Sequence, residues 1–193
     1  AKSFPMPLKE EYNYLPNLQA IPEEIRQKAK VMILNFPGNP VPALATKEFF
    51  EEVVEFARTY NIVIVHDFAY CELYFEKEKP ISFLSVEGAK EVGVEFNSMS
   101  KSFNMAGCRI GYVVGNTVIL EALDRFKSNL DYGVFYPIQK AAVVALQNSA
   151  SFTTKQRDIY TKRRDILIDG LRSIGWEVDS PKASMFIWAK VPS

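Results

Sequence analysis

Polar residues that could carry chemistry follow several short apolar runs of the sequence. Continuous apolar runs of this kind are typical of strands buried in a parallel sheet. Ligands of open α/β sheets bind at the carboxyl ends of the strands, so residues placed directly after the runs are candidates for one shared site. The first three runs are followed by Asn39, by Asp67 and Tyr70, and by Ser98, Ser100 and Lys101, and Arg109 comes eight residues after Lys101.

Together, the candidates match the needs of one kind of ligand, a phosphorylated aldehyde that contains a pyridine ring. A carboxylate such as Asp67 pairs with a ring nitrogen, and Asn39 and Tyr70 can bond a phenolic oxygen. The serine hydroxyls and the guanidinium of Arg109 suit a phosphate, and the amine of Lys101 can add to the aldehyde. Taken singly, each residue also fits an ordinary turn, cap or exposed position. The combination is what indicates a cofactor site.

The elements that must position these residues follow from hydrophobic periodicity. It predicts strands over residues 31–34, 62–65, 92–96 and 109–114, the first buried on both faces, and a closing strand over 185–189. It predicts helices over 46–60, 118–130, 137–147 and about 152–174, the first capped by Thr46 and the last ending at Gly175. Residues 1–22 are expected to be extended, and residues 73–90 to form a loop with a short helix. Alternating strands and helices indicate an α/β fold on a mostly parallel sheet, and the change to consecutive helices places a domain boundary near residue 148.

Composition excludes several classes of protein. The 193 residues are 48% hydrophobic, which allows a substantial core, and their 23 basic and 23 acidic residues give no net charge. A disordered chain and a general nucleic-acid binder are therefore disfavoured. Cys71 and Cys108 are too few for a disulfide scaffold and are expected to be buried and unreactive, and His66 alone cannot form a multi-histidine metal site. With no apolar run of ~20 residues and no signal peptide, we expect a cytoplasmic protein without a membrane partner.

Three motifs in order carry a resemblance to a known family. Asn39-Pro40, Asp67-Phe68-Ala69-Tyr70 and Ser98-Met99-Ser100-Lys101, the last followed by Gly107-Cys108-Arg109-Ile110-Gly111, resemble the signature of fold type I, class I/II aminotransferases, which use pyridoxal 5′-phosphate (PLP). Segments at 49–54, 104–107, 163–165 and 181–186 resemble the branch of bacterial alanine (glutamate–pyruvate) transaminases and LL-diaminopimelate aminotransferases. The resemblance implies a partial three-layer α/β/α PLP-binding domain over residues 1–148. It also implies the linker helix and first strand of a smaller α+β domain over residues 149–193.

The resemblance also implies roles for the candidate residues. Lys101 would form the internal aldimine with PLP and later move a proton between the substrate Cα and the cofactor. Asp67 would pair with the pyridinium nitrogen, while Asn39 and Tyr70 would bond the ring oxygen. Ser98 and Arg109 would hold the phosphate, with Ser100 ranked below Ser98. No residue is assigned to a metal.

The implied reaction is the transfer of an amino group between an amino acid of the alanine or glutamate type and a 2-oxo acid. LL-diaminopimelate or another amino acid is the alternative substrate. A PLP-dependent lyase or decarboxylase on the same fold and a non-catalytic PLP-fold module also stay open. A dinucleotide-binding domain is disfavoured because no Gly-x-Gly-x-x-Gly follows the first strand. The family forms homodimers, and we expect a homodimer of the intact protein.

The sequence departs from the family pattern at several places. Asn39-Pro40 continues with Val41-Pro42 instead of the usual Thr-Gly, and Cys108 stands where a large aromatic residue is common. Family enzymes are substantially longer, and the residues that stack on the pyridine ring and bind the substrate α-carboxylate have no match here. We therefore expect these 193 residues to be a piece of a longer enzyme that does not catalyse transamination alone.

Overall fold

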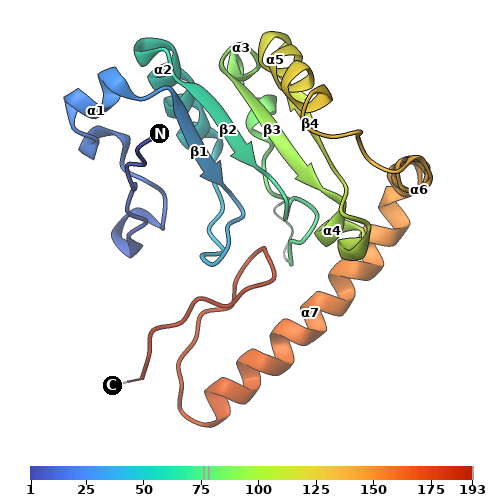
Figure 1. Ribbon diagram of the computed structural model, residues 1–193. Helices are drawn as coiled ribbons and strands as arrows, with labels where there is room; N and C mark the ends of the chain where they lie inside the picture. The colour runs from blue at the N-terminus through green and yellow to red at the C-terminus, as the bar shows by residue number, and fades with distance from the viewer. Residues whose placement is uncertain (76, 78, 193) are drawn as a thin grey trace.

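The computed structural model describes residues 1–75, 77 and 79–192, and a four-stranded sheet forms the centre of this part (Figure 1). The neighbouring strands, in chain order, are β1 (Val31–Asn35), β2 (Val63–Asp67), β3 (Gly93–Ser98) and β4 (Gly111–Gly115). β1, β2 and β3 are parallel, whereas β4 runs antiparallel to β3. The expected strands near residues 31–34, 62–65, 92–96 and 109–114 and the mostly parallel sheet are confirmed.

The helices agree with the long periodic segments of the sequence. The α-helices of the described residues are α1 (Glu23–Lys28), α2 (Lys47–Tyr60), α3 (Ala89–Val92), α4 (Met99–Ser102), α5 (Thr117–Ser128), α6 (Tyr136–Gln147) and α7 (Ser149–Ser173). Thr46 caps α2 by accepting a hydrogen bond from the Phe49 N–H at 3.2 Å, as expected. Gly175 follows α7 with a φ of 82°, a left-handed conformation that favours glycine. The short helices α1 and α4 were not predicted, because neither is long enough to show a periodic pattern.

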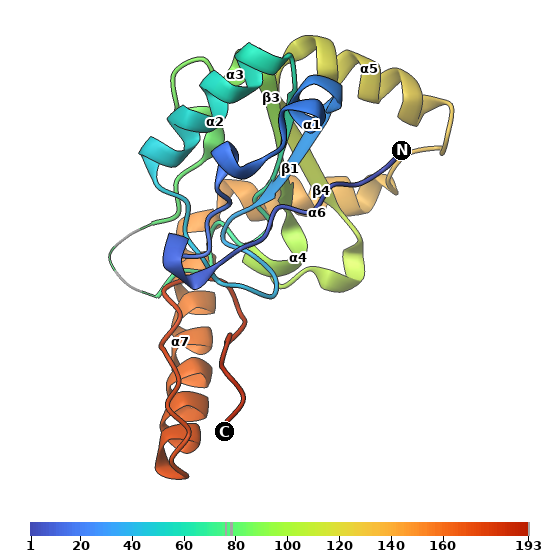
Figure 2. The same ribbon diagram turned by 90° about the vertical axis from the view of Figure 1, so that its left-hand side faces the viewer.

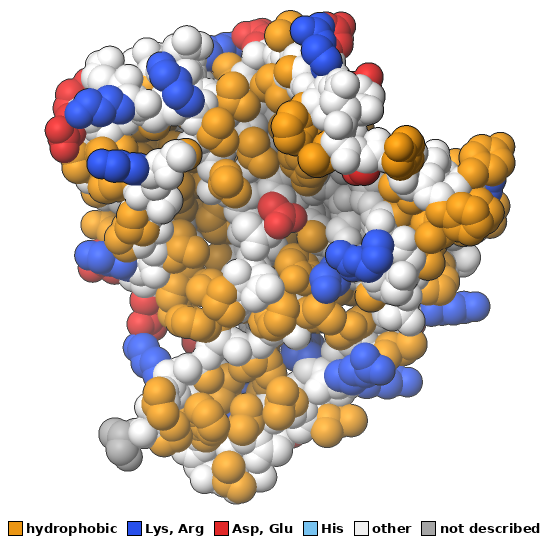
Figure 3. Space-filling model, viewed as in Figure 1, with side chains coloured by type: hydrophobic (Ala, Val, Ile, Leu, Met, Phe, Trp, Pro, Cys, Tyr) orange, Lys and Arg blue, Asp and Glu red, His pale blue; other side chains and the backbone are white. Residues whose placement is uncertain are grey.

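The core lies between α2 and one face of the sheet, while α5 lies on the opposite side (Figure 2). Phe50 and Val53 of α2 and Ile64 of β2 are fully buried in this cluster. On β1, Met32 and Leu34 are buried, but Val31 and Ile33 are 52% and 68% exposed. The expectation that this strand is buried on both faces is therefore wrong, because no helix among the described residues covers its second face. Figure 3 shows hydrophobic side chains over much of the surface in the view of Figure 1.

Val53 provides a test of this core. Val53→Ala is expected to lower the free energy of unfolding by about 2–3 kcal/mol, because it removes two buried methyl groups and leaves a cavity. Urea denaturation of the intact protein would measure the loss as a lower midpoint at an unchanged slope. Val118→Ala on α5 removes the same atoms from a side chain that is 73% exposed, and it should change the free energy by less than about 0.5 kcal/mol. Equal losses in both variants would contradict this account of the core.

The chain after α7 turns back toward the carboxyl ends of the strands (Figures 1 and 2). The prediction of a strand over residues 185–189 is wrong, since the described residues of this segment form no ladder. An isolated antiparallel bridge joins Tyr74 to Ala183, but a strand requires several consecutive residues paired with a neighbouring strand.

The boundary predicted near residue 148 falls between α6 and α7, and the division into two domains stays a prediction. None of the helices in the described ranges is long and apolar enough to cross a membrane.

Candidate active site

The sheet topology brings the candidate residues to one edge. Asn35 and Asp67 lie opposite each other at the ends of the parallel strands β1 and β2, and Asp67 lies opposite Phe96 of β3. Because β4 is antiparallel, its first residues start at the edge where β3 ends, with Gly111 opposite Ser98. Arg109, which directly precedes β4, therefore returns to the same edge as the residues that follow the parallel strands.

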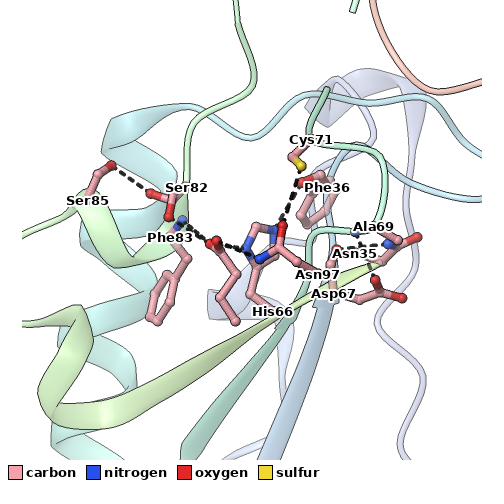
Figure 4. A network of polar contacts seen from close by, with 11 residues as sticks. Asn35, Phe36, His66, Asp67, Ala69, Cys71, Ser82, Phe83, Ser85 and Asn97 are labelled. Carbon is pink, nitrogen blue, oxygen red and sulfur yellow. Dashed lines mark hydrogen bonds and ion pairs between the residues drawn. The ribbon is translucent and has the colours of Figure 1, made fainter. Parts of the chain in front are cut away.

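Asp67 is held by one hydrogen bond to its carboxylate and one to its backbone, and its Oδ2 has no hydrogen-bond partner among the described residues. Its Oδ1 accepts a hydrogen bond from the Ala69 N–H at 3.1 Å, while the Asn35 side-chain amide donates to the Asp67 carbonyl at 2.9 Å (Figure 4). The Asn35 Oδ1 accepts from the Asn39 N–H at 2.8 Å. Asn35 thus joins the segments that carry two of the predicted site residues, Asp67 and Asn39. The residue types around Pro37 and Gly38 predict a turn but not this bridge, so Asn35 could not be predicted from the sequence.

Tyr70 and Lys101 lie next to each other. Tyr70 is buried, and the Lys101 Nζ lies 5.9 Å from the centre of its ring. The ring of Phe186, which comes from the segment after α7, packs edge-on against the Tyr70 ring with centroids 5.6 Å apart. Phe186 could not be predicted as a neighbour of the site, because no spacing rule links a residue so far along the chain to Tyr70.

Burial raises the pKa of the Tyr70 phenol above its usual value of 10.0. A hydrogen-bonding contribution from the Asn39 side chain acts in the opposite direction, and the negative charge of Asp67 adds to the increase. These influences place Asn39, Asp67 and Tyr70 within one electrostatic environment. At neutral pH the phenol keeps its proton and can act as a hydrogen-bond donor.

Ser98, Ser100 and Arg109 gather at the start of α4. The Ser98 Oγ caps this helix by accepting from the Ser100 N–H at 3.2 Å, which leaves its own O–H available as a donor. The Met99 N–H donates to the Ile110 carbonyl at 3.2 Å, so the chain around Arg109 lies against the chain around Ser98. Arg109 is exposed, and one of its nitrogens donates to the Ala106 carbonyl at 3.0 Å. Gly111 permits this approach, because a Cβ there would lie 2.5 Å from the Asn97 carbonyl oxygen.

Side chains from distant segments hold the turn that carries Asn39. The His66 ring contacts the Phe36 carbonyl at 3.0 Å, and the Ser184 hydroxyl donates to the Gly38 carbonyl at 2.8 Å. A Cβ at Gly38 would lie 2.4 Å from the Val41 carbonyl oxygen, so this position accepts only glycine without rearrangement. The replacement of the family's Thr-Gly by Val41-Pro42 therefore leaves Asn39 in an ordered turn.

The donor set fits PLP. The same edge of the sheet carries one carboxylate, a phenol with an adjacent amide, a lysine amine, and two serine hydroxyls beside a guanidinium. The hydroxyl of Ser98 and the exposed part of Arg109 have hydrogen-bonding capacity left for a phosphate. A cavity of about 1190 Å³ runs beside β1, and of the seven candidate residues only Asn39 lines it, so this cavity is not the candidate site. Among the residues that the structure describes, no group of three His, Cys, Asp or Glu side chains could hold a metal ion.

Cys71, which is next to Tyr70, and Cys108 are only partly buried. The expectation that both are buried is therefore wrong. Burial raises the pKa of the Cys71 thiol from 9.0 to about 11, while a hydrogen bond from Ser102 opposes the increase. Since the thiol pKa is higher in the folded than in the unfolded protein, the thiol stabilises the fold below about pH 9, and this contribution is lost as the pH rises toward about 11.

Cys71 should therefore react slowly with alkylating reagents. At pH 8.5 its thiolate fraction is about 100-fold smaller than that of an ordinary thiol, because the thiolate is the reactive form. Iodoacetamide labelling followed by peptide mapping should show a rate that keeps increasing up to about pH 11. The same peptide in urea-unfolded protein is the control. A labelling rate that levels off near pH 9 in the folded protein would contradict the raised pKa.

Comparison with known proteins gives one family throughout. A family model described as aminotransferase class I and II matches residues 1–193. The chain is 49% identical over 191 residues to an LL-diaminopimelate aminotransferase of Halothermothrix orenii, covering 99% of this chain and 49% of the relative. It is 50% identical over 192 residues to an LL-diaminopimelate aminotransferase of Dehalococcoides mccartyi, covering 100% of this chain and 50% of the relative. The chain thus spans about half the length of the curated relatives it matches.

Solved structures agree in fold. Apo-BacF from Bacillus subtilis superposes with a TM-score of 0.93 at 40% identity, covering 97% of this chain and 48% of that one. A probable N-succinyldiaminopimelate aminotransferase from Thermus thermophilus superposes with a TM-score of 0.90 at 34% identity, covering 99% of this chain and 51% of that one. The expected α/β fold, with its mostly parallel sheet, is confirmed by these matches.

Proposed function

Because the chain belongs to the class I and II aminotransferases, with their fold type I architecture, we propose that the intact protein is a PLP-dependent transaminase. The observation that carries the proposal is the placement of Asp67, Tyr70, Lys101, Ser98 and Arg109 along one edge of the sheet. This edge offers a carboxylate, a phenol, an amine, hydroxyls and a guanidinium, which are the groups that the cofactor would need.

Each residue of the site has a defined task in the proposed reaction. Asp67 would pair its carboxylate with the ring nitrogen, and Asn39 and Tyr70 would donate hydrogen bonds to the ring oxygen. Ser98, Arg109 and, with a weaker claim, Ser100 would hold the phosphate. When bound, PLP takes up the amino group of the substrate and delocalises the electron pair left by removal of the Cα proton. The Lys101 Nζ would accept that proton from the substrate Cα and then deliver it to the cofactor.

Cofactor binding by the intact protein is the first test. We expect purified protein to absorb in the visible range, and borohydride reduction followed by peptide mapping to find the cofactor on Lys101. Protein without such absorbance, or with the adduct on another lysine, would overturn the proposal. A keto acid formed from an added amino donor indicates transamination. Release of ammonia, thiol or carbon dioxide would instead indicate a lyase or decarboxylase, and cofactor binding without any product would indicate a non-catalytic module.

The names of the most similar relatives favour LL-diaminopimelate as the amino donor. Alanine or glutamate is the second candidate, which the motifs of the branch suggest. Single-turnover rates of the PLP form with LL-diaminopimelate, alanine, glutamate and aspartate would decide between them. We expect LL-diaminopimelate to react at least about tenfold faster than alanine. Equal rates for the two would contradict this choice of substrate.

We also propose that the intact protein is a homodimer. Large apolar side chains are exposed at the end of α5 and the start of α6, and a folded protein rarely leaves such a cluster in water. Its members, each more than 60% exposed, are Phe126, Leu130, Tyr132, Phe135 and Tyr136. Sizing chromatography with light scattering should give a dimer with cofactor bound. An active monomer would refute the dimer while leaving the transaminase proposal in place.

A further inference from the structure

A buried pair of ionisable side chains lies on the face of the sheet opposite Asp67. His66 of β2 and Glu95 of β3 are neighbours across the two strands, and they are 0% and 4% exposed. The His66 Nδ1 lies 3.1 Å from the Glu95 Oε2, and the His66 Nε2 lies 3.0 Å from the Phe36 carbonyl oxygen (Figure 4). Neither side chain faces the proposed cofactor, so the mechanism above does not use them.

The hydrogen bonds around the pair are the basis for assigning its hydrogens. A carbonyl oxygen only accepts, so the His66 Nε2 carries a hydrogen. The Glu95 Oε2 also accepts from the Ser82 hydroxyl at 2.8 Å and from the Phe83 N–H at 3.0 Å. With these donors already directed at one oxygen, we assign a carboxylate to Glu95 and a second hydrogen to the His66 Nδ1. The pair is then a buried imidazolium and a buried carboxylate. Such a pair adds little net stability to a fold, because the cost of removing both charges from water offsets their attraction.

Each end of this network adjoins a residue of the proposed site. His66 directly precedes Asp67, and the Phe36 carbonyl lies in the turn that carries Asn39. The Glu95 Oε1 lies 3.5 Å from the Asn97 amide, and Asn97 directly precedes Ser98. The Asn97 Oδ1 in turn contacts the Cys71 thiol at 3.4 Å, next to Tyr70. The pair is therefore connected, through hydrogen bonds and adjacent backbone, to the segments that carry Asn39, Asp67, Tyr70 and Ser98.

We propose that His66 and Glu95 form a positioning charge pair that sets the direction of the cofactor-facing residues without touching the cofactor. The proposal rests on the transaminase function argued above. Side chains alternate along a strand, so a contact that fixes His66 on one face also fixes the direction of Asp67 on the other. Such supporting contacts matter because a small misplacement of a binding group lowers affinity and rate strongly.

Three variants of the intact protein test the pair: His66→Gln, Glu95→Gln and the double variant. Apo-protein would be titrated with PLP, and the dissociation constant and the absorption band of the bound cofactor would be measured. Each single variant should weaken PLP binding by about tenfold and shift the band, because it leaves one buried charge without its partner. The double variant should recover part of this loss, since two neutral amides can share a hydrogen bond. Losses that add up independently would overturn the pair.

A loss of folding must be separated from a loss of positioning. Val53→Ala lowers stability in the same core but removes no hydrogen bond of the pair, so well below its melting temperature it should bind PLP within about twofold of wild type. Ser82→Ala is a mild variant that removes one hydrogen bond to Glu95 and should weaken PLP binding by about threefold. Its matched control is Ser85→Ala, which removes a hydroxyl that, among the described residues, bonds only to the Ser82 carbonyl, and this variant should have no effect.

The charge assigned to His66 can be measured in protein without the cofactor. In apo-protein labelled with ¹⁵N-histidine, the signal that His66→Gln removes should be that of an imidazolium with hydrogens on both nitrogens. A neutral imidazole would overturn the charge pair. Wild-type protein that does not bind PLP would overturn the transaminase proposal and this inference with it. Wild-type binding with unchanged binding in Glu95→Gln and Ser82→Ala would overturn this inference alone.

Discussion

Replacing Lys101 with alanine is expected to abolish measurable transamination by the intact protein. Loss of a general acid–base alone lowers a rate by about 10²–10⁴-fold, and this variant also loses the only amine beside Tyr70 among the described residues. The change is small in structural terms, because Lys101 is half-buried and makes no side-chain hydrogen bond within the described part. Single-turnover measurement of keto acid from the amino donor, at saturating PLP, would give the size of the loss.

Two controls separate chemistry from charge. Lys101→Arg keeps the positive charge but cannot lose a proton at neutral pH, so it should be as inactive as the alanine variant. Lys162→Ala removes an exposed lysine of α7 and should retain full activity. Added methylamine should restore part of the rate to Lys101→Ala, because a free amine can move the same proton. Activity of Lys101→Ala within tenfold of wild type would contradict the role of Lys101.

Replacing Asp67 with asparagine should lower the rate by about 10²–10³-fold, the usual effect of removing one preorganised electrostatic partner. The substitution isolates the charge. An asparagine oxygen can still accept the hydrogen bond from the Ala69 N–H, and the bond from Asn35 goes to the backbone of residue 67. The ring nitrogen of the cofactor would then lose its carboxylate partner. Steady-state rates and a PLP titration would measure the effects on turnover and on binding.

Asp67→Glu is the matched variant, since it keeps the charge and moves it by one methylene group. It should retain more activity than Asp67→Asn if the charge matters more than the position. Asp124→Asn removes an exposed carboxylate from α5 and should leave the rate unchanged. Equal rates for Asp67→Asn and Asp124→Asn would show that Asp67 has no electrostatic part in the reaction.

Local sequence patterns were sufficient for the main elements and for the order of the candidate residues. The apolar runs before Asn35, Asp67 and Ser98 became parallel neighbours, and the periodic segment after Thr46 became α2. Strand and helix periodicity is a property of a few consecutive residues, which explains why it could be read from the chain. The rule that ligands bind at the carboxyl ends of parallel strands then directed attention to the same edge of the sheet.

Contacts between distant segments required the tertiary structure. The sequence alone predicted the seven candidates Asn39, Asp67, Tyr70, Ser98, Ser100, Lys101 and Arg109. It did not predict the Asn35 bridge, the contact of Phe186 with Tyr70 or the buried pair of His66 and Glu95. It also predicted a strand over 185–189 that has no ladder partner among the described residues. Such features depend on which strand lies beside which and in what register. Register is set by the packing of the whole sheet and not by the residues that a contact joins.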